Sequence, residues 1–241
     1  MDALIYTAMS GAERALRGQQ VHANNLANMD TGGFRANLEL ATAQSLTGSG
    51  YDDRHMAQLQ ANGVLTRQGT EKATGRELDV SISGDGFFTV QGPTGEAYTR
   101  AGAMTLDNNG QLMVNGNPIL GEGGPITLPE YTKIAVGQDG TISIQSPGTA
   151  TMQTIDKLKL VKADASELTK NEAGLLVARN GQPLPTDPTV LVRPGYLEGS
   201  NVSAVEEMVA TMSLNRTFEV QMKLLTSADT NAQTGNRLIT G

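Results

Sequence analysis

Residues 78–90 read LDVSISGDGFFTV, and this stretch decides the fold of the middle of the chain. Apolar and polar residues alternate over residues 78–82, which is the two-residue period of a β-strand. Gly84-Asp85-Gly86 is a turn signal, and the strand-forming residues 87–90 follow it. The stretch therefore predicts two short strands separated by a tight turn.

Similar turn signals recur through residues 81–199. They are Asn108-Asn109-Gly110, Asn115-Gly116-Asn117, Gln138-Asp139-Gly140 and Asn180-Gly181. Residues 157–161, with the sequence KLKLV, form another candidate strand. Short strands with turns at this spacing are typical of a β-sandwich or an irregular barrel. We therefore expect residues 78–199 to form a central, mainly-β domain.

The two ends of the chain lack the residues that break helices. All nine prolines lie between Pro93 and Pro194, and residues 200–234 contain no glycine. Ser203 and Glu206 have the spacing of a capping box, which marks the start of a helix. The sequence predicts one helix over about residues 3–28 and a second over about residues 203–236.

Each predicted helix carries a narrow stripe with alternating spacings of three and four residues. The first stripe consists of Ile5, Ala8, Ala12 and Ala15 and continues through Gln19 and His22 to Leu26. The second consists of Phe218, Met222, Leu225, Asp229, Ala232, Asn236 and Ile239. Such a stripe resembles a coiled-coil seam and is too narrow to hold a helix alone in water. Each helix therefore needs a partner, in the same subunit or in a neighbouring one.

The fold class that follows is α+β, with long N- and C-terminal helices in a coiled-coil-like layer and a central β domain inserted between them. The expected segments are an N-terminal helical assembly segment (1–35), an extended arm or linker (36–77), the central β domain (78–199) and a C-terminal helical assembly segment (200–241). The arm is polar with little periodicity, so it is either extended or ordered only on binding.

Composition excludes several classes of activity. There is no cysteine, and His22 and His55 are the only histidines, so no cofactor and no metal site is expected. The formal net charge of −7 argues against a nucleic-acid partner. Asp79 and Asp85 could be imagined as a glycosidase pair, but strand-edge and turn roles suit them better. The Asp107-Asn108-Asn109-Gly110 stretch favours a hairpin turn over a calcium loop. No catalytic residues are expected.

No targeting or membrane signal is visible. The residues that begin the sequence, MDALIY, have neither a basic region nor a long apolar region, so a cleaved signal peptide is not expected. No apolar run approaches the ~18 residues of a membrane span, so direct membrane insertion is not expected either.

Three stretches together resemble the rod and hook family of flagellar axial proteins. The first is Ala23-Asn24-Asn25-Leu26-Ala27-Asn28 with Thr31-Gly32-Gly33-Phe34-Arg35. The second is residues 78–90 with Tyr98-Thr99-Arg100-Ala101-Gly102. The third begins at Leu197-Glu198-Gly199-Ser200-Asn201-Val202 and continues through Asn215-Arg216-Thr217-Phe218-Glu219 to Asp229. Within this family, about 240 residues is too long for the small rod subunits and too short for a typical hook protein, and the opening residues 2–12 resemble a proximal-rod member more than a distal-rod member.

The resemblance implies a structural subunit of the flagellar basal-body rod, the drive shaft that transmits torque from motor to hook. It implies export by the flagellar type III apparatus without signal cleavage, assembly in the periplasmic space, and partners that are further copies and other rod proteins. The subunit interface is expected to include Ile5, Ala8, Ala12, Asn24, Asn25, Leu26, Asn28, Phe34, Val205, Met208, Met212, Phe218, Met222 and Leu225.

Two other readings stay open from the sequence. One is a distal-rod or other axial subunit of the same family. The other is a secreted β-domain binding protein or enzyme whose helical ends are incidental.

Overall fold

The computed structural model describes residues 2–45 and 55–240. Internal contacts divide the chain into two compact units. The helical unit comprises Met1–Ala27, Asn37–Asn62 and Ser203–Gly241, and the β unit comprises Asn28–Ala36 and Gly63–Val202. The order of an N-terminal helix, a strand-rich middle and a C-terminal helix confirms the expected α+β class.

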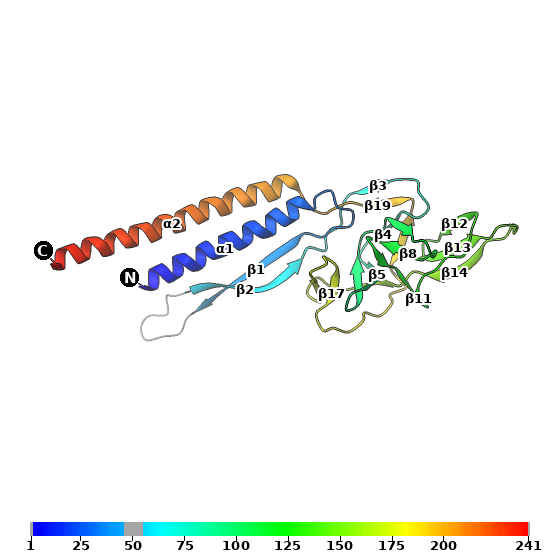
Figure 1. Ribbon diagram of the computed structural model, residues 1–241, viewed down its shortest axis with the longest axis horizontal. Coiled ribbons are helices and arrows are strands. Elements are labelled where there is room, and N and C mark those ends of the chain that lie inside the picture. Colours follow the sequence, from blue (N-terminus) through cyan, green and yellow to red (C-terminus); the bar gives the residue numbers. More distant parts are fainter. Residues whose placement is uncertain (1, 46–54, 241) are drawn as a thin grey trace. The chain divides into compact units, whose positions relative to one another are not determined.

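The helical unit is built on two long helices, α1 (Asp2–Ala27) and α2 (Ala204–Thr240). They lie side by side and run in opposite directions (Figure 1). Ser203 caps α2: its Oγ accepts a hydrogen bond of 3.5 Å from the backbone N–H of Glu206, and its carbonyl oxygen accepts one of 3.0 Å from Glu207. Both predicted helices are confirmed, and α2 continues about one turn beyond its predicted end.

The predicted arm contains regular structure. Strands β1 (Asn37–Ser45) and β2 (His55–Val64) pair as a two-stranded sheet, and β1 lies against α1 (Figure 1). Further along, β3 (Glu71–Ala73) pairs with a strand from the C-terminal part of the β unit. The part of the arm between residues 46 and 54 lies outside the described residues.

The β unit consists of many short strands in antiparallel pairs. After β3 they are β4 (Val80–Ser83), β5 (Phe87–Gly92), β6 (Gly95–Thr99), β7 (Met104–Leu106), β8 (Leu112–Val114), β9 (Asn117–Pro118), β10 (Leu120–Gly121), β11 (Gly124–Pro125), β12 (Lys133–Val136), β13 (Thr141–Gln145), β14 (Gln153–Lys157), β15 (Leu160–Val161), β16 (Leu168–Lys170), β17 (Leu176–Ala178), β18 (Leu191–Pro194) and β19 (Tyr196–Glu198). The largest sheet has the order β15-β5-β6-β17-β16. Two three-stranded sheets, β12-β13-β14 and β7-β8-β9, and the pairs β10-β11, β18-β4 and β19-β3 complete the unit.

Most predicted turns are confirmed as hairpin turns. Residues 107–111 join β7 to β8, residues 115–116 join β8 to β9, and residues 137–140 join β12 to β13. Asp107 accepts hydrogen bonds from the backbone N–H groups of Asn109 (2.8 Å) and Gln111 (2.7 Å), so this aspartate shapes a turn.

The two strands and the turn predicted over residues 78–90 are confirmed. The turn at residues 84–86 joins strands of different sheets, because β4 pairs with β18 whereas β5 pairs with β6 and β15. One local prediction needs correction. The strand predicted over residues 157–161 is divided between β14 and β15, since the backbone at Leu158 and Lys159 bonds instead to Gly140 and Leu120. Pairing partners distant in sequence decide which sheet a strand joins and where it ends, and the local alternation of apolar and polar residues does not predict either.

The core of the β unit is mainly aliphatic, as the scarcity of aromatic residues in the sequence requires. The main cluster includes Val80, Ile82, Leu112, Ile142 and Ile144, all almost fully buried. Phe88 is the aromatic residue within it, and a second cluster surrounds Phe87 and Tyr98. Burying such side chains contributes about 1.5–3 kcal/mol each before ordering costs.

Candidate assembly interface

Small residues line the face of α1 that meets α2. Ala8, Ala12 and Ala15 are buried, with exposed fractions of 3%, 7% and 1%. A Cβ atom added at Gly11 on the same face would lie 2.9 Å from side-chain atoms of Gln221 on α2. Small side chains allow helix backbones to approach closely, so this face is shaped for the helix that covers it.

Polar side chains continue the contact between the helices. Gln19 donates a hydrogen bond of 2.7 Å to the Oδ1 of Asn215, and the Nδ1 of His22 bonds to Glu207. Asn25 donates one of 3.2 Å to the same glutamate. Partly buried polar contacts between helices can set their register, because a shifted helix leaves these groups without partners.

Asn25 also ties α1 to β1. Its Oδ1 accepts a hydrogen bond of 2.8 Å from the backbone N–H of Asn37, and its Nδ2 donates one of 3.1 Å to the carbonyl oxygen of the same residue. Asn24 accepts a hydrogen bond of 3.0 Å from the Asn37 side chain. Both asparagines, which the sequence places at the subunit interface, thus also make contacts inside the subunit.

The inner stripe of α2 differs from the predicted one by one residue at alternate positions. Phe218, Leu225 and Ala232 are partly buried as expected, but the positions between them are Gln221 and Ala228. Met222, Asp229 and Asn236 lie on the exposed side, and the side chain of Ile239 is outside the described ones. The sequence favours Met222 as the more apolar choice, whereas the structure selects Gln221 by its place on the helix.

A second apolar stripe lies on the opposite side of α2. Val205 is 71% exposed and Met212 is 58% exposed, and Met208, Val209 and Val220 are exposed near them. At about 100° per residue, these positions lie across the helix from Leu214 and Phe218, which face α1. An apolar stripe on each side of one helix is more than the helix needs to cover α1, so the outer stripe is a candidate docking surface.

On α1, the remaining predicted interface residues have mixed environments. Ile5 is 36% exposed, and Met9 and Leu16 on the same flank are also exposed. Leu26 is partly buried.

Two predicted residues belong to the β unit. Asn28 accepts hydrogen bonds from Thr31, and the Phe34 ring lies under the ammonium group of Lys170, with Nζ 3.7 Å from the ring centroid.

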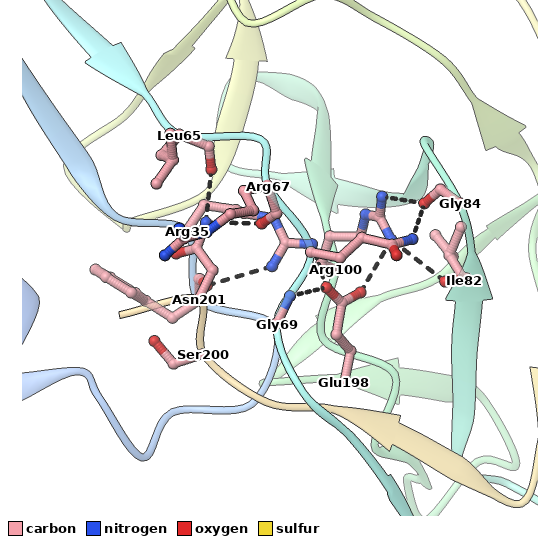
Figure 2. Close-up of polar contacts among 12 residues, drawn as sticks. Arg35, Leu65, Arg67, Gly69, Ile82, Gly84, Arg100, Glu198, Ser200 and Asn201 are labelled. Atoms are coloured by element: carbon pink, nitrogen blue, oxygen red, sulfur yellow. Dashed lines mark hydrogen bonds and ion pairs between the residues drawn. The ribbon is translucent and has the colours of Figure 1, made fainter. Parts of the chain in front are cut away.

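The β unit contains a buried charge cluster that sequence analysis did not single out as a site. Glu198 accepts hydrogen bonds of 2.5 Å from Arg35 and 2.9 Å from Arg100, and all three side chains are almost fully buried (Figure 2). Burial lowers the pKa of Arg100, the carboxylate of Glu198 raises it, and the positive charge of Arg35 lowers it further. The cluster holds two cations and one anion in a medium of low dielectric constant, so its stability depends on the carboxylate.

Asn201 organises the backbone next to this cluster. Its Oδ1 accepts a hydrogen bond of 2.8 Å from the N–H of Ala36, and its Nδ2 donates to the carbonyl oxygens of Leu65 and Arg67 (Figure 2). Three stretches that resemble the flagellar family, residues 31–35, 98–102 and 197–202, therefore meet in one place. Their motifs were visible in the sequence, but their convergence required the fold.

Lys170 lies at the edge of the same region. Its Nζ donates a hydrogen bond of 2.5 Å to the carbonyl oxygen of Arg35. Burial, with a smaller effect from the charge of Arg35, lowers the pKa of Lys170 to about 8. The lysine thus holds the segment that contains Phe34 and Arg35 against β16.

Neither a metal centre nor a membrane span is found in the described ranges. Residues 2–45 and 55–240 contain no group of three or more His, Cys, Asp and Glu side chains that could hold a metal ion. Within the same ranges, neither helix is long and apolar enough to cross a membrane. Asp79 is buried next to Arg76, whereas the Asp85 side chain is exposed, so the two carboxylates have unlike environments.

Three family descriptions match successive parts of the chain. Residues 5–35 match the flagella basal body rod protein family, and residues 81–144 match the D1 domain of the flagellar hook protein FlgE/F/G. Residues 193–238 match the C-terminal region of the flagellar basal body rod FlgEFG proteins. These matches include the residues of both helix faces and all three segments of the charge cluster, residues 31–35, 98–102 and 197–202.

Full-length relatives define the class. The chain is 41% identical to the flagellar basal-body rod protein FlgF of Salmonella typhimurium, and the alignment covers 99% of each chain. The same identity and coverage apply to FlgF of Escherichia coli. Identity to the flagellar basal-body rod protein FlgG of Buchnera aphidicola is 33%, over 93% of this chain and 95% of the relative. The chain belongs to the family of flagellar basal-body rod proteins, and its two relatives at 41% identity are both named FlgF, which confirms the predicted resemblance to a rod member of the family.

Proposed function

We propose that the chain polymerises through its terminal helices into the flagellar rod, with further copies and other rod proteins as its neighbours. Membership of the basal-body rod family makes it a structural subunit of the rod. In this role it carries no cofactor and no active site, and it transmits torque from motor to hook through packed helices.

The outer stripe of α2 carries this proposal. One side of α2 is covered by α1, while Val205, Met208 and Met212 on the other side are exposed. Full burial of each such side chain is worth about 1.5–3 kcal/mol before ordering entropy, so several together can hold a neighbour. Repetition along a helical lattice multiplies these weak contacts, because every subunit is held on more than one side.

The proposed occupant is a helix of a neighbouring axial subunit. The exposed flank of α1, with Ile5, Met9 and Leu16, supplies an apolar surface of matching kind. Packing that flank of one subunit on the outer stripe of α2 in the next would give a coiled-coil-like layer in which both helices have two partners. The intersubunit roles of Asn24, Asn28 and Phe34 remain part of this proposal.

The proposed location is the basal-body rod in the periplasmic space. Export by the flagellar type III apparatus without signal cleavage is part of the same proposal, and the absence of cysteine suits it because no disulfide can form before assembly. The net charge of −7 argues against nucleic acid as a partner.

Substitution of the outer stripe tests the proposal. Met212→Glu places a charge in the surface that must be desolvated on assembly, so we expect loss of swimming and of the subunit from isolated basal bodies. Thr217→Glu is the control, because Thr217 is exposed on the same helix but lies beside the stripe.

The two variants should have the same far-UV circular dichroism as purified proteins, so that a difference in assembly cannot come from misfolding. Normal incorporation of the Met212→Glu protein into basal bodies would overturn the proposal. The position of the subunit in isolated basal bodies separates a proximal-rod role from the distal-rod alternative that the similarity to FlgG raises.

A further inference from the structure

The charge cluster joins segments from the two ends of the β unit. The carbonyl oxygen of Glu198 accepts a hydrogen bond of 2.8 Å from the N–H of Gly33, and its Oε1 accepts one of 2.8 Å from the N–H of Gly69. Asn201 bonds the backbone of Ala36 on one side and of Leu65 on the other. Residues 198–201 thus provide the partners that hold the segments at residues 33–36 and 65–69 in place.

The two arginines of the cluster have no other carboxylate within ion-pair distance among the described residues. Apart from Glu198, Arg100 donates to the carbonyl oxygens of Ile82 and Gly84, and Arg35 donates to that of Phe34. Without Glu198, two guanidinium groups that repel each other would be buried with carbonyl oxygens as their acceptors. Arg100 would keep the attraction of the exposed Asp85 carboxylate and of the Phe87 ring, 5.4 Å from its Cζ, but neither forms an ion pair with it. Burial of uncompensated charge is strongly unfavourable, so this arrangement is not stable before the carboxylate is in place.

Strand pairing imposes the same order. Strand β3 pairs with β19, and β4 pairs with β18, each in a two-stranded sheet. Strands β3 and β4 therefore obtain their strand partners from residues 191–198, more than a hundred positions later, although the N–H of Val80 in β4 also bonds to the nearer carbonyl oxygen of Gly102. Contacts at such separation form late, because closing a long loop costs entropy before any contact is gained.

We propose that residues 191–201, with Glu198 at their centre, act as a latch that keeps the β unit from folding until the C-terminal part of the chain is available. Before residues 191–201 are available, the segments with Arg35 and Arg100 have no counterion and stay unfolded. When Glu198 binds the two arginines, β18 and β19 pair with β4 and β3, and the β unit folds. Folding of the β unit is then a single late event.

The latch matters for a chain that emerges N-terminus first. About four fifths of the sequence is released before residue 198, and the latch keeps that part unfolded for longer than a locally folding domain would stay unfolded. This consequence rests on the export proposed above, since a subunit that must pass an export apparatus gains from folding late. The folding order itself requires neither export nor assembly and can be tested on the purified chain.

Pulse-labelling hydrogen exchange during refolding of the full wild-type chain tests the order of events. We expect the amides of β4, β5 and β6 to become protected at the same rate as those of β18 and β19. Protection of β4–β6 in an earlier phase would overturn the latch. This measurement needs no variant, so it holds even where a substitution prevents folding.

Equilibrium exchange of two matched variants tests the role of charge. Glu198→Gln should lower the protection of β5 and β6 amides by about 100-fold or more, because it leaves the two arginines unneutralised. Glu71→Gln is the control: Glu71 pairs with Arg193 at the surface, opposite Glu198 in the β3–β19 register, and should change protection less than about fivefold. Equal losses of protection in the two variants would overturn the role of Glu198.

Discussion

A Cβ atom placed on Gly33 would lie 2.1 Å from the backbone nitrogen of Ala101. Gly33 also has a φ of +70°, a conformation that costs other residues energy. The absence of a side chain lets the segment before Arg35 lie directly on the backbone after Arg100, which brings the two arginines to the same carboxylate. The contact explains why the stretch at residues 31–35 needs glycine at this position.

Gly33→Ala is expected to destabilise the β unit more than the left-handed backbone alone would. The left-handed conformation costs about 1–2 kcal/mol, and contact with rigid backbone adds to it, so we expect a loss of at least about 3 kcal/mol. Urea unfolding followed by tyrosine fluorescence measures this loss. Gly75→Ala is the control, because Gly75 has a φ of +73° with nothing within 4 Å of its added Cβ. Equal losses at the two positions would rule out the steric argument.

The lowered pKa of Lys170 predicts a dependence of stability on pH. Burial lowers its pKa from 10.5 in the unfolded chain to about 8 in the folded one. Between these values the unfolded state binds more protons than the folded state, so the contribution of Lys170 to stability rises with pH from about 8 to about 10.5. Below pH 8 both states are protonated, and the cost of burying the charge is fully present.

Comparison of two variants isolates this effect. The wild-type chain should gain stability relative to Lys170→Met as the pH rises through the window, measured by urea unfolding at several pH values. Lys170→Arg keeps its charge over the whole window, so its stability relative to Lys170→Met should stay constant. A wild-type chain that follows the arginine variant would show that Lys170 does not titrate in this range.

The helices and most turns could be predicted from the sequence because their causes are local. Helix boundaries follow from residues close together in sequence: the absence of proline, the cap at Ser203 and the three-four spacing. Turns are marked by glycines such as Gly110 and Gly116, which adopt the positive φ that the turn requires. The side of α2 that meets α1 was predicted only in part. Met222 has the more apolar side chain, but the structure leaves Met222 44% exposed and has Gln221 partly buried against α1.

The buried charge cluster could not be predicted as a site from the sequence. Arg35, Arg100 and Glu198 are far apart along the chain, and charged residues are usually exposed. The three stretches that resemble the flagellar family contain these residues, but the resemblance does not show that they lie close together. Only the antiparallel pairing of β19 with β3 brings Glu198 beside Gly69 and between the two arginines.

The small-residue face of α1 predicts intolerance to larger side chains. Ala12→Leu inserts three carbons into a buried contact with α2 and should cost about 1–3 kcal/mol of helix-pair stability. Thermal unfolding followed by far-UV circular dichroism measures the change. Ala23→Leu is the control at an exposed position of the same helix, and it should leave stability nearly unchanged. Comparable losses for the two would mean that α1 does not depend on close approach to α2.

The contact between His22 and Glu207 is expected to couple the two helices. Glu207→Ala leaves His22 and Asn25 without a shared acceptor, and the coupling free energy with His22→Ala in a double-mutant cycle should be about 1 kcal/mol. The cycle is measured by urea unfolding followed by far-UV circular dichroism. A second cycle pairs His22→Ala with Glu219→Ala, an exposed glutamate in the middle of α2, and should give no coupling beyond about 0.3–0.5 kcal/mol. The helix pair presents the outer stripe, so loss of the His22–Glu207 contact should also weaken assembly. A coupling free energy between His22 and Glu207 that is no larger than the one between His22 and Glu219 would show that this contact does not set the helix register.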